Sequence, residues 1–60
     1  MNKFQKDQKL KVLSADEADE KYIGKIGKVI DCNTFYYTLD MGDGTKDDPP
    51  FFQEHELTEA

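Results

Sequence analysis

Apolar and polar residues alternate along two stretches of the chain, a pattern typical of strands that bury one face. In residues 8–13 the alternation points Leu10 and Val12 inward. Residues 34–41 form the longer stretch, and one face of it carries four large side chains: Phe35, Tyr37, Leu39 and Met41. We predict a strand at each place, with these side chains in the core.

Two further segments predict strands of a different kind. Residues 23–30 are rich in β-branched side chains, which favour strands, and they contain Gly24 and Gly27. Because glycine permits a sharp bend or a close backbone approach, we expect this strand to turn a corner at its glycines. Residues 51–52 are two phenylalanines, and alternation must turn one of them outward. We assign Phe52 to the outer surface.

The segments between these strands predict loops and turns. Residues 14–21 are acidic and lack an apolar stripe, so we expect a long first loop, with a short helix as the alternative. Residues 31–33 and 42–45 contain the small and polar residues that favour turns. The two prolines at 49–50 lack backbone donors and cannot join a central strand.

The two ends of the chain are polar. Apart from Met1, residues 1–7 contain a single apolar side chain, Phe4, and predict a flexible tail that leaves residues 8–58 as one domain. Residues 53–56 suit a single 3₁₀ turn, after which Leu57 returns to the core and the last three residues form a second tail.

Short strands joined by glycine-containing turns, without a periodic helix, indicate an all-β fold. Sixty residues allow only one small domain. We therefore expect a five-stranded, partly open barrel with a long first loop and one 3₁₀ turn near its C-terminus.

The order of these elements resembles the SH3-like barrel superfamily, in particular its KOW-type domains and small bacterial or prophage modules of the YorP-like kind. The resemblance lies in residues 10–13, the Gly24-Lys25-Ile26-Gly27-Lys28-Val29 segment, Met41-Gly42-Asp43-Gly44 and residues 51–57. It implies a barrel whose members differ widely in function. The chain lacks the tryptophan of peptide-binding SH3 domains and is acidic where nucleic-acid-binding KOW domains are usually basic.

Charge is unevenly distributed along the chain, which has a net charge of −5 and no arginine. The first half holds seven of the eight lysines, whereas the second half holds eight of the thirteen acidic residues. Arginine is the usual residue for bidentate phosphate and base contacts, so nucleic acid is not the expected partner. The expected acidic rim consists of Asp40, Asp43, Asp47, Asp48, Glu54 and Glu56.

Residues that could support catalysis or metal binding are few. Cys32 is the only thiol and His55 the only imidazole, and no catalytic motif surrounds either. A calcium loop beginning at Asp43 would place Asp48 where the sharp turn requires glycine. The glycines of residues 24–28 are too closely spaced for a P-loop. We expect no catalytic residue, no metal and no cofactor.

An outward aromatic on the strand of residues 34–41 is the main candidate for function. Tyr36 lies between Thr34 and Thr38 on the polar face, unless it packs beneath Phe4. Exposed aromatics of this kind often form binding surfaces in small β-domains. The expected interaction surface is Tyr36, Lys11, Lys25, Lys28 and Phe52.

These features predict a small non-enzymatic module that binds a protein partner or serves as an accessory subunit. A single cysteine and the absence of an apolar leader or membrane span predict a monomer in the cytoplasm, possessing neither a secretory signal nor a membrane anchor. The alternative is a KOW-like nucleic-acid-binding module, with Tyr36 stacking on a base beside the lysines of residues 9–28.

Overall fold

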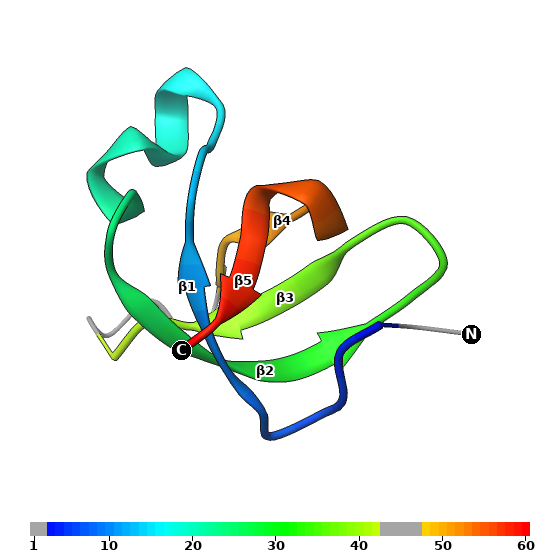
Figure 1. The fold of residues 1–60 in the computed structure, drawn as a ribbon. Helices are drawn as coiled ribbons and strands as arrows, with labels where there is room; N and C mark the ends of the chain where they lie inside the picture. The colour runs from blue at the N-terminus through cyan, green and yellow to red at the C-terminus, as the bar shows by residue number, and fades with distance from the viewer. Residues whose placement is uncertain (1–2, 43–47) are drawn as a thin grey trace.

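Five short antiparallel strands form one sheet in the computed structural model, which describes residues 3–42 and 48–60 (Figure 1). The strand order is β4-β3-β2-β1-β5. Along the chain the elements are β1 (Lys9–Val12), η1 (Glu17–Tyr22), β2 (Ile26–Cys32), β3 (Tyr37–Asp40), β4 (Phe51–Phe52), η2 (Glu54–Glu56) and β5 (Leu57–Glu59), where η denotes a 3₁₀ helix. The all-β class expected from the alternation is confirmed.

Strand β2 is the longest and lies at the centre of the sheet, between the β1–β5 pair and the β3–β4 pair. Lys28 pairs with Lys9 of β1 on one side and with Asp40 of β3 on the other. The register with β3 shifts between Val29 and Asp31, so the irregularity in this strand lies at residue 30 and not at its glycines. An extra residue in a ladder bends the strand. This bend lets β2 pair with β1 along one edge and with β3 along the other.

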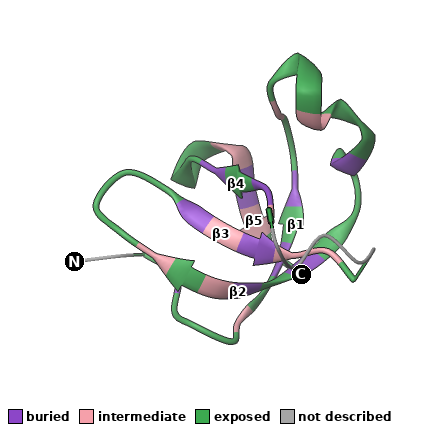
Figure 2. Ribbon diagram, turned by 180° about the vertical axis from the view of Figure 1, so that it is seen from behind, coloured by how far each residue is buried: buried purple, intermediate pink, exposed green. Residues whose placement is uncertain are grey.

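Along the strands, buried residues of the core alternate with more exposed ones (Figure 2). Leu10, Val12 and Leu39 are fully buried, and Leu57 returns to the core as expected. Met41 is half-buried against this cluster. The remaining core residues are Phe4, Tyr22, Val29, Tyr37 and Phe52.

Phe35 was expected in the core, and the structure corrects this. Its side chain is 75% exposed, because β3 begins only at Tyr37 and the preceding residues form the hairpin turn. The side-chain oxygen of Asn33 accepts hydrogen bonds from the backbone N–H groups of Phe35 and Tyr36, at 2.7 and 2.9 Å. An asparagine side chain that accepts bonds from the backbone two and three residues later stabilises a turn, so the strand is correspondingly shorter.

The segment before β1 packs against the sheet instead of forming the expected tail. Phe4 is only 2% exposed and its ring contacts Tyr37 edge-on, with ring centres 5.4 Å apart. The Phe4 N–H donates to the Tyr37 hydroxyl at 3.2 Å, and the Asp7 N–H donates to the Val29 carbonyl at 2.7 Å. Residues 3–7 therefore belong to the domain.

The first loop contains the short helix that was the alternative expected there, and the C-terminus adds a strand. The acidic loop contains η1, which begins after Asp16 and ends at Tyr22, a core residue that meets Phe52 edge-on. Leu57 begins β5, whose Thr58 pairs with Lys11, so the expected C-terminal tail is an edge strand. Of the turn predicted at residues 42–45, only Gly42 is described. The acidic positions Asp43 and Asp47 lie outside the described residues.

Candidate functional site

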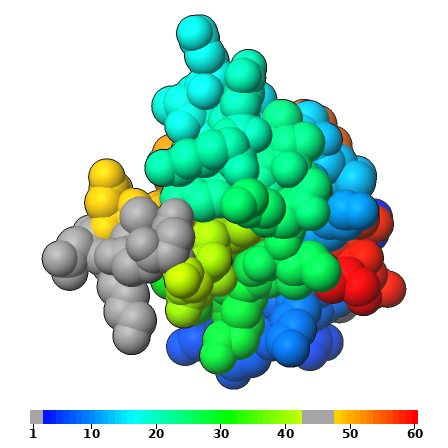
Figure 3. All heavy atoms as spheres, turned by 90° about the vertical axis from the view of Figure 1, so that its left-hand side faces the viewer, coloured from blue at the N-terminus to red at the C-terminus, as the bar shows by residue number. Residues whose placement is uncertain are grey.

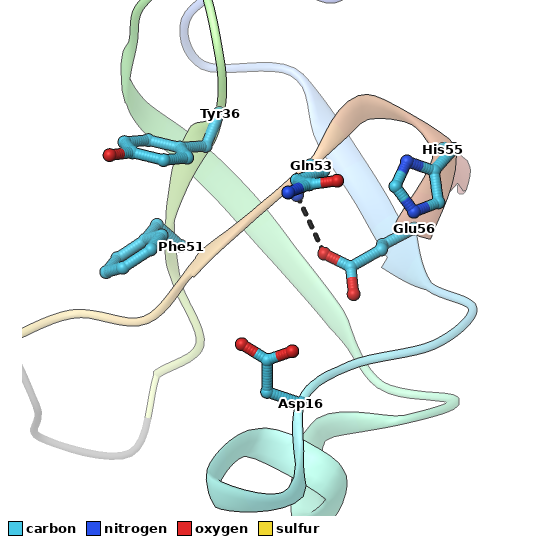
Figure 4. Close-up of a pocket in the computed structure, with 6 residues that line it drawn as sticks. All are labelled: Asp16, Tyr36, Phe51, Gln53, His55 and Glu56. Carbon is cyan, nitrogen blue, oxygen red and sulfur yellow. Dashed lines mark hydrogen bonds between the residues drawn. The ribbon is translucent and has the colours of Figure 1, made fainter.

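A pocket of about 200 Å³ lies where the first loop, the β2–β3 turn, β4 and η2 meet (Figure 4). Segments far apart in sequence converge here, so the pocket exists only in the folded chain. Its lining residues are Asp16, Tyr36, Phe51, Gln53, His55 and Glu56. We call this site the aromatic pocket.

Two neighbouring rings form one wall of the aromatic pocket. The ring centres of Tyr36 and Phe51 are 4.6 Å apart and their planes are inclined by 43°. Both side chains are accessible, at 36% exposed for Tyr36 and 55% for Phe51. Burying such rings against a partner releases water from large apolar surfaces at a small cost in side-chain entropy.

Phe51 occupies this surface in place of Phe52. In the β3–β4 ladder Phe52 lies opposite the buried Tyr37, whereas Phe51 lies opposite Thr38. Residues paired directly across a ladder share a face, so Phe52 is directed into the core and is 2% exposed. The assignment of Phe52 to the interaction surface was therefore wrong, although the expectation that one phenylalanine faces outward is correct.

The opposite side of the pocket is acidic. Asp16 is the residue that precedes η1, and Glu56 is the last residue of η2. Both carboxylates line the pocket. The Gln53 N–H donates to the Glu56 carboxylate at 2.8 Å, while the Glu56 N–H donates to the Gln53 carbonyl at 2.9 Å. These reciprocal bonds hold the Glu56 side chain at the pocket.

Charge and ring geometry together favour a cation in this pocket. Two carboxylates face two aromatic side chains, and no lysine of the described part of the chain lines the site. A cationic group is attracted both by the faces of aromatic rings and by carboxylates. The pocket can therefore accept a lysine or arginine side chain and pack its aliphatic part against Phe51.

The lysines expected beside Tyr36 lie elsewhere. Lys11 and Lys28 are exposed on β1 and β2, and Lys25 is exposed just before β2; none of the three lines the aromatic pocket. Lys28 instead lines a second hollow, together with Lys9 and Ile26. The interaction surface expected from the sequence is thus divided between two places.

The remaining reactive side chains form no recognisable catalytic arrangement. His55 lines the aromatic pocket, whereas Cys32 is half-buried at the end of β2 and does not line it. Within residues 3–42 and 48–60, no group of three or more His, Cys, Asp or Glu side chains is placed to hold a metal ion. In the same ranges no helix has the length and apolar character needed to cross a membrane.

Comparison with known proteins finds no relative of this chain. Neither the family models nor the curated proteins nor the solved structures include a match. Function is therefore inferred from the chemistry of the surface itself.

Proposed function

We propose that this chain is a small non-enzymatic SH3-like module that binds a protein partner through the aromatic pocket. The observation that carries the proposal is the pairing of two accessible rings, Tyr36 and Phe51, beside two carboxylates in one pocket. Aromatic side chains are enriched at protein interfaces, where they act as anchors in pockets. The strand order β4-β3-β2-β1-β5 and the 3₁₀ turn just before β5 support the SH3-like relationship.

The partner that fits this pocket is a basic segment of another protein. A lysine or arginine would lie between the rings and the carboxylates of Asp16 and Glu56, and an adjoining apolar residue would cover Phe51. Opposite charges accelerate the approach of two proteins more than they strengthen the final complex. We therefore expect the chain to associate with its partner rapidly and in a salt-sensitive manner. We further propose that it is a monomeric accessory protein of a cytoplasmic bacterial or prophage system.

The positions of the lysines weigh against the KOW-like alternative. A nucleic-acid surface of the expected kind needs an aromatic side chain for stacking among cations for the phosphates. Here Tyr36 adjoins Asp16 and Glu56, whereas Lys9 and Lys28 line a separate hollow. Phosphate groups would be repelled beside the rings of the aromatic pocket.

Affinity capture with the full chain tests the proposal. The immobilised protein and three variants, Tyr36→Ala, Phe51→Ala and Leu13→Ala, are exposed to lysate of the source cells. Leu13 is a matched control, since it is 52% exposed but lines no part of the aromatic pocket. We expect a basic protein to be retained by the unmodified chain and by the Leu13 variant, and lost from both pocket variants. Equal retention by all four proteins would refute the assignment of the site.

A defined probe separates the pocket chemistry from the identity of the partner. The amide of N-acetyl-arginine is titrated into the isotopically labelled protein while backbone shifts are recorded. We expect saturable shifts centred on Tyr36, Phe51 and Glu56, and much smaller shifts with the amide of N-acetyl-glutamate. Equal responses to both compounds would show that the pocket does not select a cation.

A further inference from the structure

The outer face of β1 and β2 forms a second surface, separate from the aromatic pocket (Figure 3). In this view the blue of β1, the green of β2 and the red of the C-terminal residues lie side by side. The strand register places two rows of side chains here. One row is Asp40, Lys28 and Lys9, and the other is Ile26, Lys11 and Thr58. We call Lys9, Lys11, Lys28 and Ile26 the lysine face.

Positive charge on the lysine face is incompletely neutralised. Lys9 and Lys28 are direct partners across the β1–β2 ladder, where like charges repel each other. Asp40 lies opposite Lys28 on its other side and, within residues 3–42 and 48–60, is the only carboxylate that lines the adjoining hollow. A ligand that brings carboxylates to this face would relieve the repulsion.

The centre of the face is apolar and hollow. Ile26 is 54% exposed, and it borders a depression of about 300 Å³ with the half-buried Met41. Gly27 also lines the depression, and the Met41 side chain occupies the space that a Cβ at Gly27 would need. A single apolar side chain inserted here would bury Ile26 and Met41 together.

We propose that the lysine face docks an acidic segment of a second protein, with one apolar side chain seated beside Ile26 and Met41. The segment's carboxylates pair with Lys9, Lys11 and Lys28. Because the aromatic pocket suits a basic segment, the molecule would then connect two partners of opposite charge.

The composition of the face favours a protein segment over a nucleic acid or an anionic membrane. No aromatic side chain and no arginine line the depression, so bases have nothing to stack on and phosphates no bidentate donor. The carboxylate of Asp40 would also lie against any continuous array of phosphates. An acidic peptide with one apolar residue can place its charges to avoid Asp40.

The test uses a capped synthetic peptide rich in Glu and Asp with one central leucine, titrated into the isotopically labelled full chain. We expect saturable amide shifts at residues 9–11 and 26–28. The Lys9→Gln/Lys28→Gln double variant should bind roughly tenfold more weakly. The Lys6→Gln/Lys21→Gln variant, which loses the same charge at two exposed lysines outside the face, should bind like the unmodified protein. Replacing the peptide's leucine with serine should weaken binding as well.

Several outcomes would overturn the proposal. These are shifts outside the lysine face, equal loss of binding in both double variants, or comparable affinity for a thymidine oligomer or for phosphatidylserine vesicles. The pocket variants Tyr36→Ala and Phe51→Ala should retain the acidic peptide. Failure at one surface is therefore distinguishable from failure at the other.

Discussion

At the residue scale, Gly27 has the most constrained environment of the glycines that the structure describes. A Cβ at this position would overlap the Met41 sulfur and would lie 3.2 Å from both the Asp40 carbonyl oxygen and the Leu39 Cβ. The flexible Met41 side chain can move aside, but the backbone of β3 cannot. Glycine is therefore required here by the close approach of β3 to β2, and the bend in β2 lies elsewhere.

Replacing Gly27 with valine should destabilise the protein by about 1–3 kcal/mol, the usual cost of overpacking a filled site. Urea unfolding followed by tyrosine fluorescence measures the change. Shortening the neighbour in the Gly27→Val/Met41→Ala variant should recover part of the loss caused by the Gly27 substitution. A Gly27→Val protein as stable as the original would show that β3 has room to retreat.

A pair of leucines provides a second test at this scale. Leu39 is fully buried, whereas Leu13 is 52% exposed. Leu39→Ala leaves a cavity in the core and should cost about 2–5 kcal/mol, a large part of the total stability of a domain this small. Leu13→Ala should change the unfolding free energy by no more than about 0.5 kcal/mol. Similar unfolding midpoints for the two variants would contradict the inward face assigned to β3.

At the scale of elements, the alternation predicted which side chains of a strand face the core better than it predicted the residues at which the strand begins and ends. Leu10 and Val12 face inward in β1 as expected, since they alternate with the exposed Lys9 and Lys11. The start of β3 was misjudged because the alternation continues through Phe35, while the hydrogen bonds of Asn33 hold that residue in the turn. Periodicity alone does not reveal such side-chain bonds.

The N-terminal segment shows the same limitation more strongly. Phe4 is the single apolar residue among polar ones, so no periodic pattern marks it, yet its ring lies against Tyr37 in the core. An isolated aromatic in a polar segment of so small a chain was the available signal. A domain of this size buries little surface, so a single ring is a substantial part of its core.

Removing the Phe4 ring should therefore destabilise the whole domain. Phe4→Ala should cost about 3–5 kcal/mol, whereas Phe35→Ala, which deletes an equal ring from an exposed position, should cost less than about 0.5 kcal/mol. If the Phe4 variant does not fold, Tyr37→Phe removes only the hydroxyl that the Phe4 N–H bonds and should cost about 1 kcal/mol. Thermal unfolding with no difference between the two phenylalanine variants would place the segment outside the fold.

At the scale of the whole molecule, the sequence indicated the chemistry of the surface but did not reveal how it is divided. Tyr36 was identified because the alternation places it on the polar face of the strand predicted over residues 34–41. Asp16 and Glu56 come from segments without a motif, and only the folded chain brings them to Tyr36. The lysines and the aromatics were assigned to one surface because linear order does not show which strands are neighbours. The strand order of the folded sheet decides which strands are neighbours, and its register decides which residues lie side by side.

This division of charge leads to a prediction about nucleic acid. The lysine face is bordered by Asp40, and the aromatic pocket contains Asp16 and Glu56. Carboxylates within about one Debye length, roughly 8 Å at physiological salt, offset much of the attraction that lysines exert on phosphates. We therefore expect no measurable binding of single- or double-stranded RNA or DNA at about 0.15 M salt, and weak, steeply salt-dependent binding below it.

Fluorescence anisotropy with labelled oligonucleotides measures this directly across a salt series. Lys9→Gln/Lys28→Gln should abolish the weak binding at low salt, because these two lysines are direct partners across the β1–β2 ladder and line the same hollow. Tyr36→Ala should leave it unchanged, since that ring lies beside acidic groups that repel phosphates. Micromolar affinity at physiological salt that is lost in the Tyr36 variant would instead make the aromatic pocket a base-stacking site, and the nucleic-acid alternative would replace the protein-binding one.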